Sequence, residues 1–261
     1  MNTGQVVLIV LSTFLFLGLY FGSSSKTSAI VSAEKKRVLE LKSTDIGALL
    51  IDAKPSLSPV QSAELLSLET KLSQSENDST SIGVYKDIAS TWYSYKRADI
   101  SGYYAKKVAE FENTEAAWAI TGTTFTLGLK NASKDKIKKF CSQNAIEAFE
   151  NAISLNPDNI QHRTNLAICY AEYPSASNPM QGIQMLLKLN KENPDDTGVL
   201  LTLARFGTQT NQFEKVEGRL QKVLALEPNN RAANCMMADV LAKLNKLEIA
   251  GPFQVKCSTQ N

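Results

Sequence analysis

Apolar residues recur at helical spacing through most of this chain, and prolines interrupt the pattern at regular intervals in its second half. Ala145 and Phe149 stand four residues apart, a spacing that places them on one face of a helix. Pro157 then breaks that helix, and cap-forming Asp and Asn residues follow it, so a new helix is expected to begin there. The same arrangement recurs at Pro194 and Pro228, at intervals of 37 and 34 residues. Such punctuation predicts stacked helical hairpins rather than one globular core.

The unit over 197–230 shows the period without any insertion, since it is 34 residues long. Its apolar residues form two groups at helical spacing, Leu200, Leu203 and Ala204, then Val216, Leu220 and Val223. The polar turn Asn211-Gln212 separates the two groups. We therefore expect two antiparallel helices in each unit.

This pattern resembles the tetratricopeptide repeat (TPR), a helical hairpin with aromatic and small residues at set places. The residues that carry the resemblance most clearly are Trp118, Gly122, Phe125, Ala145, Phe149 and Ala152. The resemblance implies an all-α fold, a right-handed α-solenoid of about five TPR-like hairpins over 82–261. The expected units are 82–114, 115–159, 160–196, 197–230 and 231–261. Their aromatic residues are expected to pack between helices, because one hairpin cannot bury its apolar face alone.

Two features depart from the repeat pattern. About eleven extra residues lie within 126–144, and they bring five lysines: Lys130, Lys134, Lys136, Lys138 and Lys139. These lysines are expected on a solvated helix end, and contact with an acidic partner or anionic lipid is the alternative. In the last unit Gly251-Pro252 is expected to interrupt the second helix.

Upstream of the repeats, residues 34–81 read as a helical pair followed by a loop. Apolar spacing predicts helices over 34–53 and 57–72, and the polar run 73–81 predicts the loop. The pair is expected to cap the solenoid, and a partner-binding arm is the alternative.

The N-terminal region has a different composition. Residues 5–22 contain no charged side chain, and eighteen residues of helix rise about 27 Å, close to the thickness of a bilayer core. We therefore expect a transmembrane anchor within 1–22 and a Ser-rich linker over 23–33. The lysines that follow, Lys26, Lys35 and Lys36, favour repeats on the cytoplasmic side. This predicts a single-pass protein of the bacterial cytoplasmic (inner) membrane.

Two alternatives to that placement stay open. The repeats could lie on the periplasmic side, or residues 5–22 could belong to a cleaved signal peptide of a secreted or periplasmic binding module. The four cysteines do not decide between them. Cys169 and Cys235 are expected to pack as small apolar residues, which suits a reducing compartment, yet four cysteines could also form two disulfides.

The sequence offers little for catalysis. Its one histidine, His162, lies near the start of a repeat helix, where a solvated or cap-adjacent role is expected. No cysteine pair with zinc-site spacing and no glycine-rich phosphate loop occurs, so we expect no catalytic residue, no metal and no cofactor. The net charge of +2 gives no reason to expect nucleic-acid binding.

The resemblance implies that partners bind the concave face, which the first helices of the hairpins line. A peptide or a partner helix would occupy that groove, so the expected function is a membrane-anchored protein–protein interaction scaffold or adaptor of an assembly, secretion or quality-control complex. The candidate binding residues from two units are Gln161, Thr164, Asn165, Ile168, Glu172, Thr202, Arg205 and Gln209.

Overall fold

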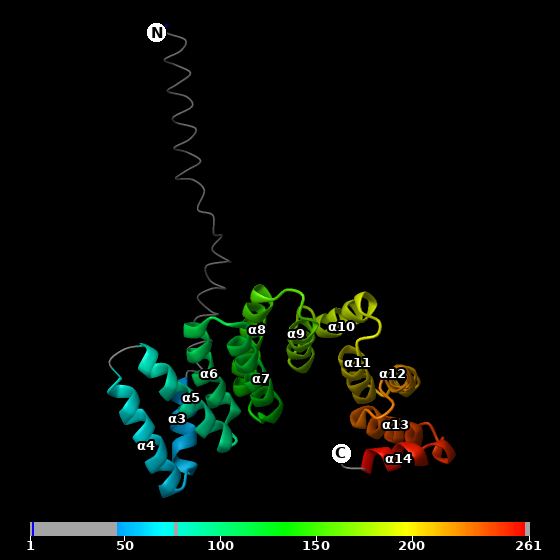
Figure 1. Cartoon of the computed structure of the whole chain (residues 1–261), viewed down its shortest axis with the longest axis horizontal. Helices are drawn as coiled ribbons and strands as arrows, with labels where there is room; N and C mark the ends of the chain where they lie inside the picture. The colour runs from blue at the N-terminus through cyan, green and yellow to red at the C-terminus, as the bar shows by residue number, and fades with distance from the viewer. Residues whose placement is uncertain (1, 3–45, 76–77, 259–261) are drawn as a thin grey trace. The chain divides into compact units, whose positions relative to one another are not determined.

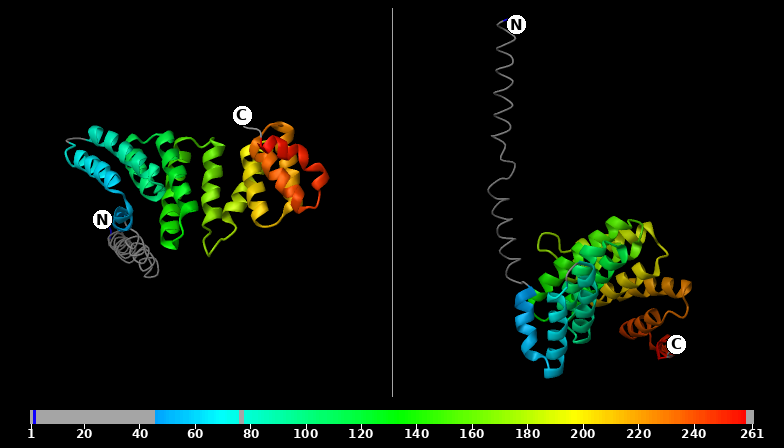
Figure 2. Two further views of the ribbon diagram at one scale, coloured as in Figure 1. Left: turned by 90° about the horizontal axis from the view of Figure 1, so that it is seen from below. Right: turned by 60° about the vertical axis from the view of Figure 1, so that its left-hand side comes forward.

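The computed structural model describes residues 2, 46–75 and 78–258 of the 261-residue chain. The chain divides into two units, Met1–Asp45 and Ile46–Asn261. All the elements below belong to the second unit. Figure 1 shows its helices following one another in chain order, and Figure 2 shows the same order in two further views.

The described part of this unit consists of helices and their connections, without a β-strand, so the prediction of an all-α fold is confirmed for those residues. The elements are α3 (Ile46–Ala53), η1 (Lys54–Ser56), α4 (Pro59–Ser73), α5 (Asp78–Ser94), α6 (Ala98–Glu112), α7 (Glu115–Asn131), α8 (Asp135–Leu155), α9 (Ile160–Glu172), α10 (Gln181–Glu192), α11 (Thr197–Gln209), α12 (Phe213–Leu226), α13 (Arg231–Lys243), η2 (Leu247–Ile249) and α14 (Gly251–Ser258). From α4 on, each α-helix packs against the next, and α7, α9, α11 and α13 also contact each other in sequence. These contacts are those of stacked, TPR-like hairpins.

The prolines mark the connections between hairpins, as the sequence predicts. The second residue after each proline caps the following helix, and its side-chain oxygen accepts a backbone N–H of the first turn at 3.0, 2.8 and 2.9 Å: Asn159 for α9, Asp196 for α11 and Asn230 for α13. Such caps satisfy backbone donors that a helix start leaves unpaired. Each proline therefore lies between the end of one helix and the cap of the next.

The turns inside the hairpins share a second backbone signature. Asn211 and Asn245 adopt left-handed φ angles of 58° and 56°, and Lys96 does the same at 62°. In each case the next residue donates its N–H to a carbonyl five positions back, at 2.9, 2.8 and 3.0 Å: Gln212 to Gly207, Lys246 to Leu241 and Arg97 to Trp92. This is the Schellman helix ending. Asn211 and Asn245 are one 34-residue period apart, so the sequence repeat reappears in the backbone.

Most residues that carry the TPR resemblance are core residues. Trp118, Phe125 and Phe149 are buried, together with the small residues Ala145 and Ala152. Gly122 has to be small because α7 approaches Phe149 of α8 closely there. A Cβ on Gly122 would lie 2.7 Å from the Phe149 ring. The prediction that these residues pack between helices is confirmed.

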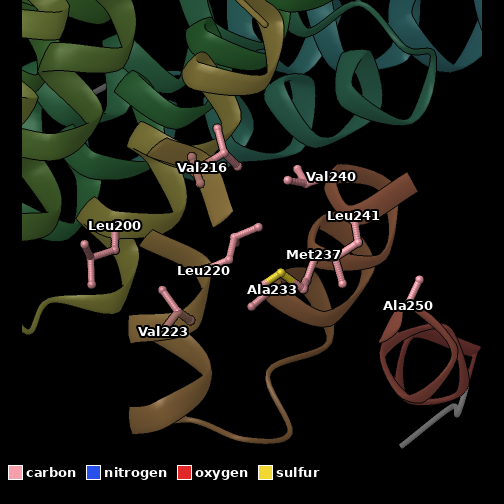
Figure 3. Packing of buried hydrophobic residues seen from close by; sticks show 10 residues of the cluster. Leu200, Val216, Leu220, Val223, Ala233, Met237, Val240, Leu241 and Ala250 are labelled. Atoms are coloured by element: carbon pink, nitrogen blue, oxygen red, sulfur yellow. The ribbon is translucent and has the colours of Figure 1, made fainter. Parts of the chain in front are cut away.

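The last two hairpins share one core. Side chains from α11, α12 and α13 point into it, as Figure 3 shows for Leu220 on α12 and Met237 on α13. Ala250, just before α14, is buried in the same cluster, and Phe253 on α14 packs against it. The short α14 thus completes the final hairpin.

The helices before the repeats pack onto the first hairpin. Leu49 of α3 and Leu65 of α4 are buried in one cluster with Ile88 and Trp92 of α5. The connection expected over 73–81 is shorter in the structure, because α4 extends to Ser73 and α5 already begins at Asp78. The part of the predicted first helix before residue 46 lies outside the described residues.

Both expected departures from the repeat take a different form in the structure. The extra residues of 126–144 lengthen α7 and α8, the latter to 21 residues, around the short connection before Asp135. Lys134 in that connection pairs with Asp52 of α3 at 3.0 Å, so it makes a contact within the chain. At Gly251-Pro252 the preceding turn η2 has ended at Ile249 and α14 begins, where proline is well tolerated in a first helical turn.

The cysteines form one pair. Cys235 of α13 and Cys257 of α14 are joined by a disulfide, so Cys235 does not pack as a thiol, and one disulfide forms where the alternative allowed two. Cys141 and Cys169 are free and buried. Burial raises the pKa of both thiols, that of Cys169 to about 11, so they stay protonated at neutral pH.

The predicted localisation is contradicted. None of the helices within 46–75 and 78–258 is both long and apolar enough to cross a membrane, which conflicts with a single-pass inner-membrane protein. The stretch 5–22, the linker 23–33 and the remainder of 1–45 apart from Asn2 lie outside the described residues.

Candidate functional site

The predicted binding residues lie on two helices that contact each other, α9 and α11. Helix α9 carries Gln161, Thr164, Asn165, Ile168 and Glu172, and α11 carries Thr202, Arg205 and Gln209. Two of them do not form an open surface. Thr164 is only 2% exposed, and Ile168 packs against the cluster around Ala167 and Leu186.

Several of the remaining side chains bond to each other or to their own helix. Gln161 Nε2 donates to Asn165 Oδ1 at 3.0 Å, and Thr202 Oγ1 donates to the Gly198 carbonyl at 2.8 Å. Helical residues four apart face the same way, which explains both contacts. Gln161 is exposed on α9, whereas Asn165 is half-buried.

Glu172 and Arg205 form an ion pair between successive repeats. The Arg205 Nη1 atom lies 2.6 Å from Glu172 Oε1, and its guanidinium lies 4.4 Å from the ring centre of Phe206. The pair therefore ties α9 to α11. A carboxylate from a partner would have to compete with Glu172 for Arg205.

Gln209 faces a different surface from the other predicted residues. It lines a pocket together with Met180, which precedes α10, and Arg219 of α12. The other seven candidate residues do not line that pocket.

A groove lies at the first hairpin, between α5, α6 and α7. It has a volume of about 540 Å³. Its lining consists of Lys86, Ala89, Ser90 and Tyr93 of α5, Ser101, Ala105, Val108 and Glu112 of α6, and Thr114, Ala116, Ala117, Ile120 and Thr124 at and along α7. We call it the α5–α7 groove.

Small side chains make the α5–α7 groove deep, and large apolar ones flank it. Ala89, Ala105 and Ala117 leave room along its length, whereas Tyr93 and Ile120 are 52% and 60% exposed. Large apolar groups exposed beside a concavity are typical of binding surfaces.

Several polar groups of the groove have partners within the chain. Ser101 Oγ donates to the Ala89 carbonyl at 2.7 Å, and Thr124 Oγ1 donates to the Ile120 carbonyl at 2.7 Å. At the end where α5 and α7 begin, Lys86 pairs with Glu112 at 2.6 Å. The groove therefore offers apolar contact along most of its length and a charged pair at one end.

The apolar pattern of the sequence did not predict this groove, because that pattern marks the buried face of the helices. Trp118 and Phe125 define the core face of α7, and Ile120 lies off that face. An isoleucine away from the core stripe was the available signal.

His162 belongs to a buried structural cluster rather than to a solvated surface. Its Nε2 lies 2.6 Å from Glu115 Oε1, and the same carboxylate accepts Nδ2 hydrogen bonds from Asn156 at 3.0 Å and Asn159 at 2.7 Å. Hydrogen bonds from Asn156, His162 and Asn159 hold the pKa of Glu115 below its usual value. The histidine thus helps to fix the connection around Pro157.

The chain can be compared with protein families, with curated proteins and with solved structures. No protein-family model matches the sequence. No curated protein matches it either.

Similar solved structures are those of MamA. MamA 41-end from Desulfovibrio magneticus RS-1 is 15% identical with a TM-score of 0.43, and the match covers 67% of this chain and 92% of that one. MamA MSR-1 is 18% identical with a TM-score of 0.39, covering 67% and 94% of the two chains. Similarity at this level carries no function to this chain. The TPR-type character rests on the hairpins, caps and turns described above.

Proposed function

We propose that this protein is a protein–protein interaction scaffold that holds an apolar segment of a partner in the α5–α7 groove. The observation that carries the proposal is the groove itself: about 540 Å³ between three helices, with Tyr93 and Ile120 exposed at its sides. An amphipathic helix or extended segment would place its apolar side chains there.

The expected energetics agree with such a role. Burying the exposed part of a large apolar side chain contributes on the order of 1 kcal/mol. Tyr93 and Ile120 can each supply such a contribution, and the hydroxyls of Ser101 and Thr124 already donate their hydrogens to carbonyls of the chain. The partner segment is therefore expected to present apolar rather than charged side chains to the groove.

The residues on α9 and α11 serve as a second, polar contact in this proposal. Gln161 and Asn165 can exchange their mutual hydrogen bond for bonds to a peptide backbone. Glu172 and Arg205 act mainly by holding the repeats together. Catalysis is not part of the proposal.

The disulfide favours the secreted or periplasmic alternative for the compartment. Disulfides such as Cys235–Cys257 persist in oxidising compartments and are rare in the bacterial cytoplasm. Alkylation of the native protein without reductant, followed by mass spectrometry of its peptides, tests this. We expect alkylated Cys235 to be absent until reductant is added, and a fully alkylated Cys235 in the unreduced protein would contradict the placement.

The groove can be tested with peptides selected from a random displayed library on the whole wild-type chain. We expect selected peptides to lose about tenfold or more in affinity for Ile120→Glu, because a charge would be buried against apolar groups. Val60→Glu on α4 is the matched control, since Val60 is also exposed and does not line the groove. Selected peptides that bind Ile120→Glu as tightly as the wild type, or a library that yields no binder, would contradict the proposal.

A further inference from the structure

A second pocket lies on other helices, between α10 and α12, with the C-terminal half of α11 beside it. Its volume is about 380 Å³. We call it the basic channel and define it by six of its lining residues: Met180, Ile183, Leu187, Phe206, Lys215 and Arg219. It shares no lining residue with the α5–α7 groove.

One side of the basic channel is apolar. Met180 precedes α10, and Ile183 and Leu187 follow at helical spacing, so the three share one face. Met180 and Leu187 are 52% and 46% exposed. This side therefore retains apolar area that the chain itself does not cover.

The other side is cationic. Lys215 and Arg219 stand four residues apart on α12, and Lys222 continues the same face one turn later. Lys222 is occupied, since it pairs with Asp195 at 3.0 Å. Lys215 donates to the Gln212 amide oxygen at 3.2 Å. Because that oxygen carries no net charge, the contact does not neutralise the Lys215 ammonium.

Arg219 differs from Arg163 and Arg205. Arg163 and Arg205 each pair with a carboxylate, at 2.9 and 2.6 Å. Arg219 Nη1 instead contacts the Leu203 carbonyl, at 3.4 Å. Burial lowers the pKa of the Arg219 guanidinium, so the group is partly desolvated without the charge partner that usually offsets this cost.

The acidic residues nearby do not supply that partner. Among the described residues that line the pocket, none is Asp or Glu. On α12 itself, Glu217 pairs with Lys246 at 2.8 Å, beyond the channel. Two cations therefore lie beside an exposed apolar strip without a carboxylate in the described lining of the channel.

We propose that the basic channel docks an acidic amphipathic helix of a partner protein, with its apolar face on α10 and its carboxylates on Lys215 and Arg219. A guanidinium binds a carboxylate through two parallel hydrogen bonds, which fixes the register of the docked helix. Met180 adapts to different apolar side chains because its unbranched thioether is flexible. The site is separate from the proposed function of the α5–α7 groove and does not depend on it.

The test uses the whole chain and a fluorescein-labelled helical peptide with leucines on one face and glutamates beside them. A second peptide keeps the leucines and carries lysines in place of the glutamates. Fluorescence anisotropy should show binding of the acidic peptide only, weakening as NaCl screens the charges. Lys215→Glu and Arg219→Gln should each reduce the affinity about tenfold.

Two controls separate a loss of binding at the basic channel from a general effect of charge or of misfolding. Lys71→Glu makes the same charge change at an exposed lysine of α4 and should leave binding unchanged. Because Arg219 contacts the Leu203 carbonyl, circular dichroism should verify the fold of Arg219→Gln, and exposed Lys215 provides an independent variant. Equal binding of both peptides, equal binding by wild type and Lys215→Glu, or loss of binding in Lys71→Glu would overturn the proposal. So would sedimentation showing that a second copy of the chain fills the channel and excludes the peptide.

Discussion

Arg205 Nη1 lies 2.6 Å from Glu172 Oε1, and the two residues belong to the first helices of successive hairpins, α11 and α9. Their side chains are 34% and 20% exposed, so water screens the pair only in part. An interaction across the hairpin boundary couples neighbouring repeats, which is how stacked hairpins gain their cooperativity.

Replacing one partner of this pair should therefore destabilise the protein. We expect Arg205→Met to lower the free energy of unfolding by about 1–2 kcal/mol, because it leaves Glu172 partly buried without its cation. The exposed pair Lys107–Glu110 is the control, and Lys107→Met should cost less than about 0.5 kcal/mol. Urea unfolding with a double-mutant cycle measures both. Equal costs at the two sites would contradict the coupling.

Gly182 should not tolerate a side chain. A Cβ there would lie 2.4 Å from the Ala167 carbonyl oxygen and 2.4 Å from the Ala171 nitrogen, and backbone cannot move aside as a side chain can. We expect Gly182→Ala to cost on the order of 2–4 kcal/mol by separating α9 from α10.

Gly218 provides the matched control for that substitution. It lies in α12, and a Cβ added there would meet no heavy atom of the described residues within 4 Å beyond its own helix backbone. Gly218→Ala should stabilise the protein by about 0.5–1 kcal/mol, since alanine favours helix. Thermal unfolding of both variants gives the comparison, and a Gly182→Ala melting temperature at or above that of the wild type would refute the close approach.

Stability should fall in mild acid partly through Glu115. Its pKa is lowered in the folded state by the hydrogen bonds from Asn156, His162 and Asn159. A lowered folded-state pKa means that the stabilisation is present above the ordinary value of 4.5 and is lost as the pH falls through the folded value. Glu115→Gln should therefore show a shallower loss of stability below pH 4.5 than the wild type. Urea unfolding across that range checks this, and identical slopes would exclude a contribution from Glu115.

The disulfide should hold α14 on the last hairpin. Closing a 22-residue separation is worth about 3 kcal/mol in the chain-entropy account. Reductant should therefore lower the melting temperature of the wild type, and it should have no further effect on Cys257→Ser. If the melting temperature of the wild type stays unchanged after complete reduction, verified by thiol counting, this role is contradicted.

Local signals in the sequence were enough for the hairpin connections. Pro157 and Asn159 act through neighbouring backbone, so their roles as helix break and cap can be read without tertiary information. The turns at Asn211 and Asn245 carried an equally local signal, two asparagines one period apart, because asparagine tolerates left-handed backbone.

The errors came where distant parts of the chain decide the outcome. Four cysteines allow several pairings, and only the approach of α14 to α13 brings Cys257 to Cys235. Thr164 was expected at the surface because its helix face was carried over from the repeat pattern, whereas packing against neighbouring helices buries it. The α5–α7 groove likewise depends on how three helices are spaced, which no single helix reveals.

The most direct test of the account follows isoleucine methyl groups by NMR in the whole chain, while a library-selected peptide is added. Ile120 lies in the α5–α7 groove, Ile168 on α9 and Ile183 in the basic channel, so each surface has its own reporter. We predict that the Ile120 methyl signal shifts most and that Ile120→Val removes this signal without abolishing binding. Shifts confined to Ile168 or Ile183, with Ile120 unchanged at saturation, would contradict the central claim.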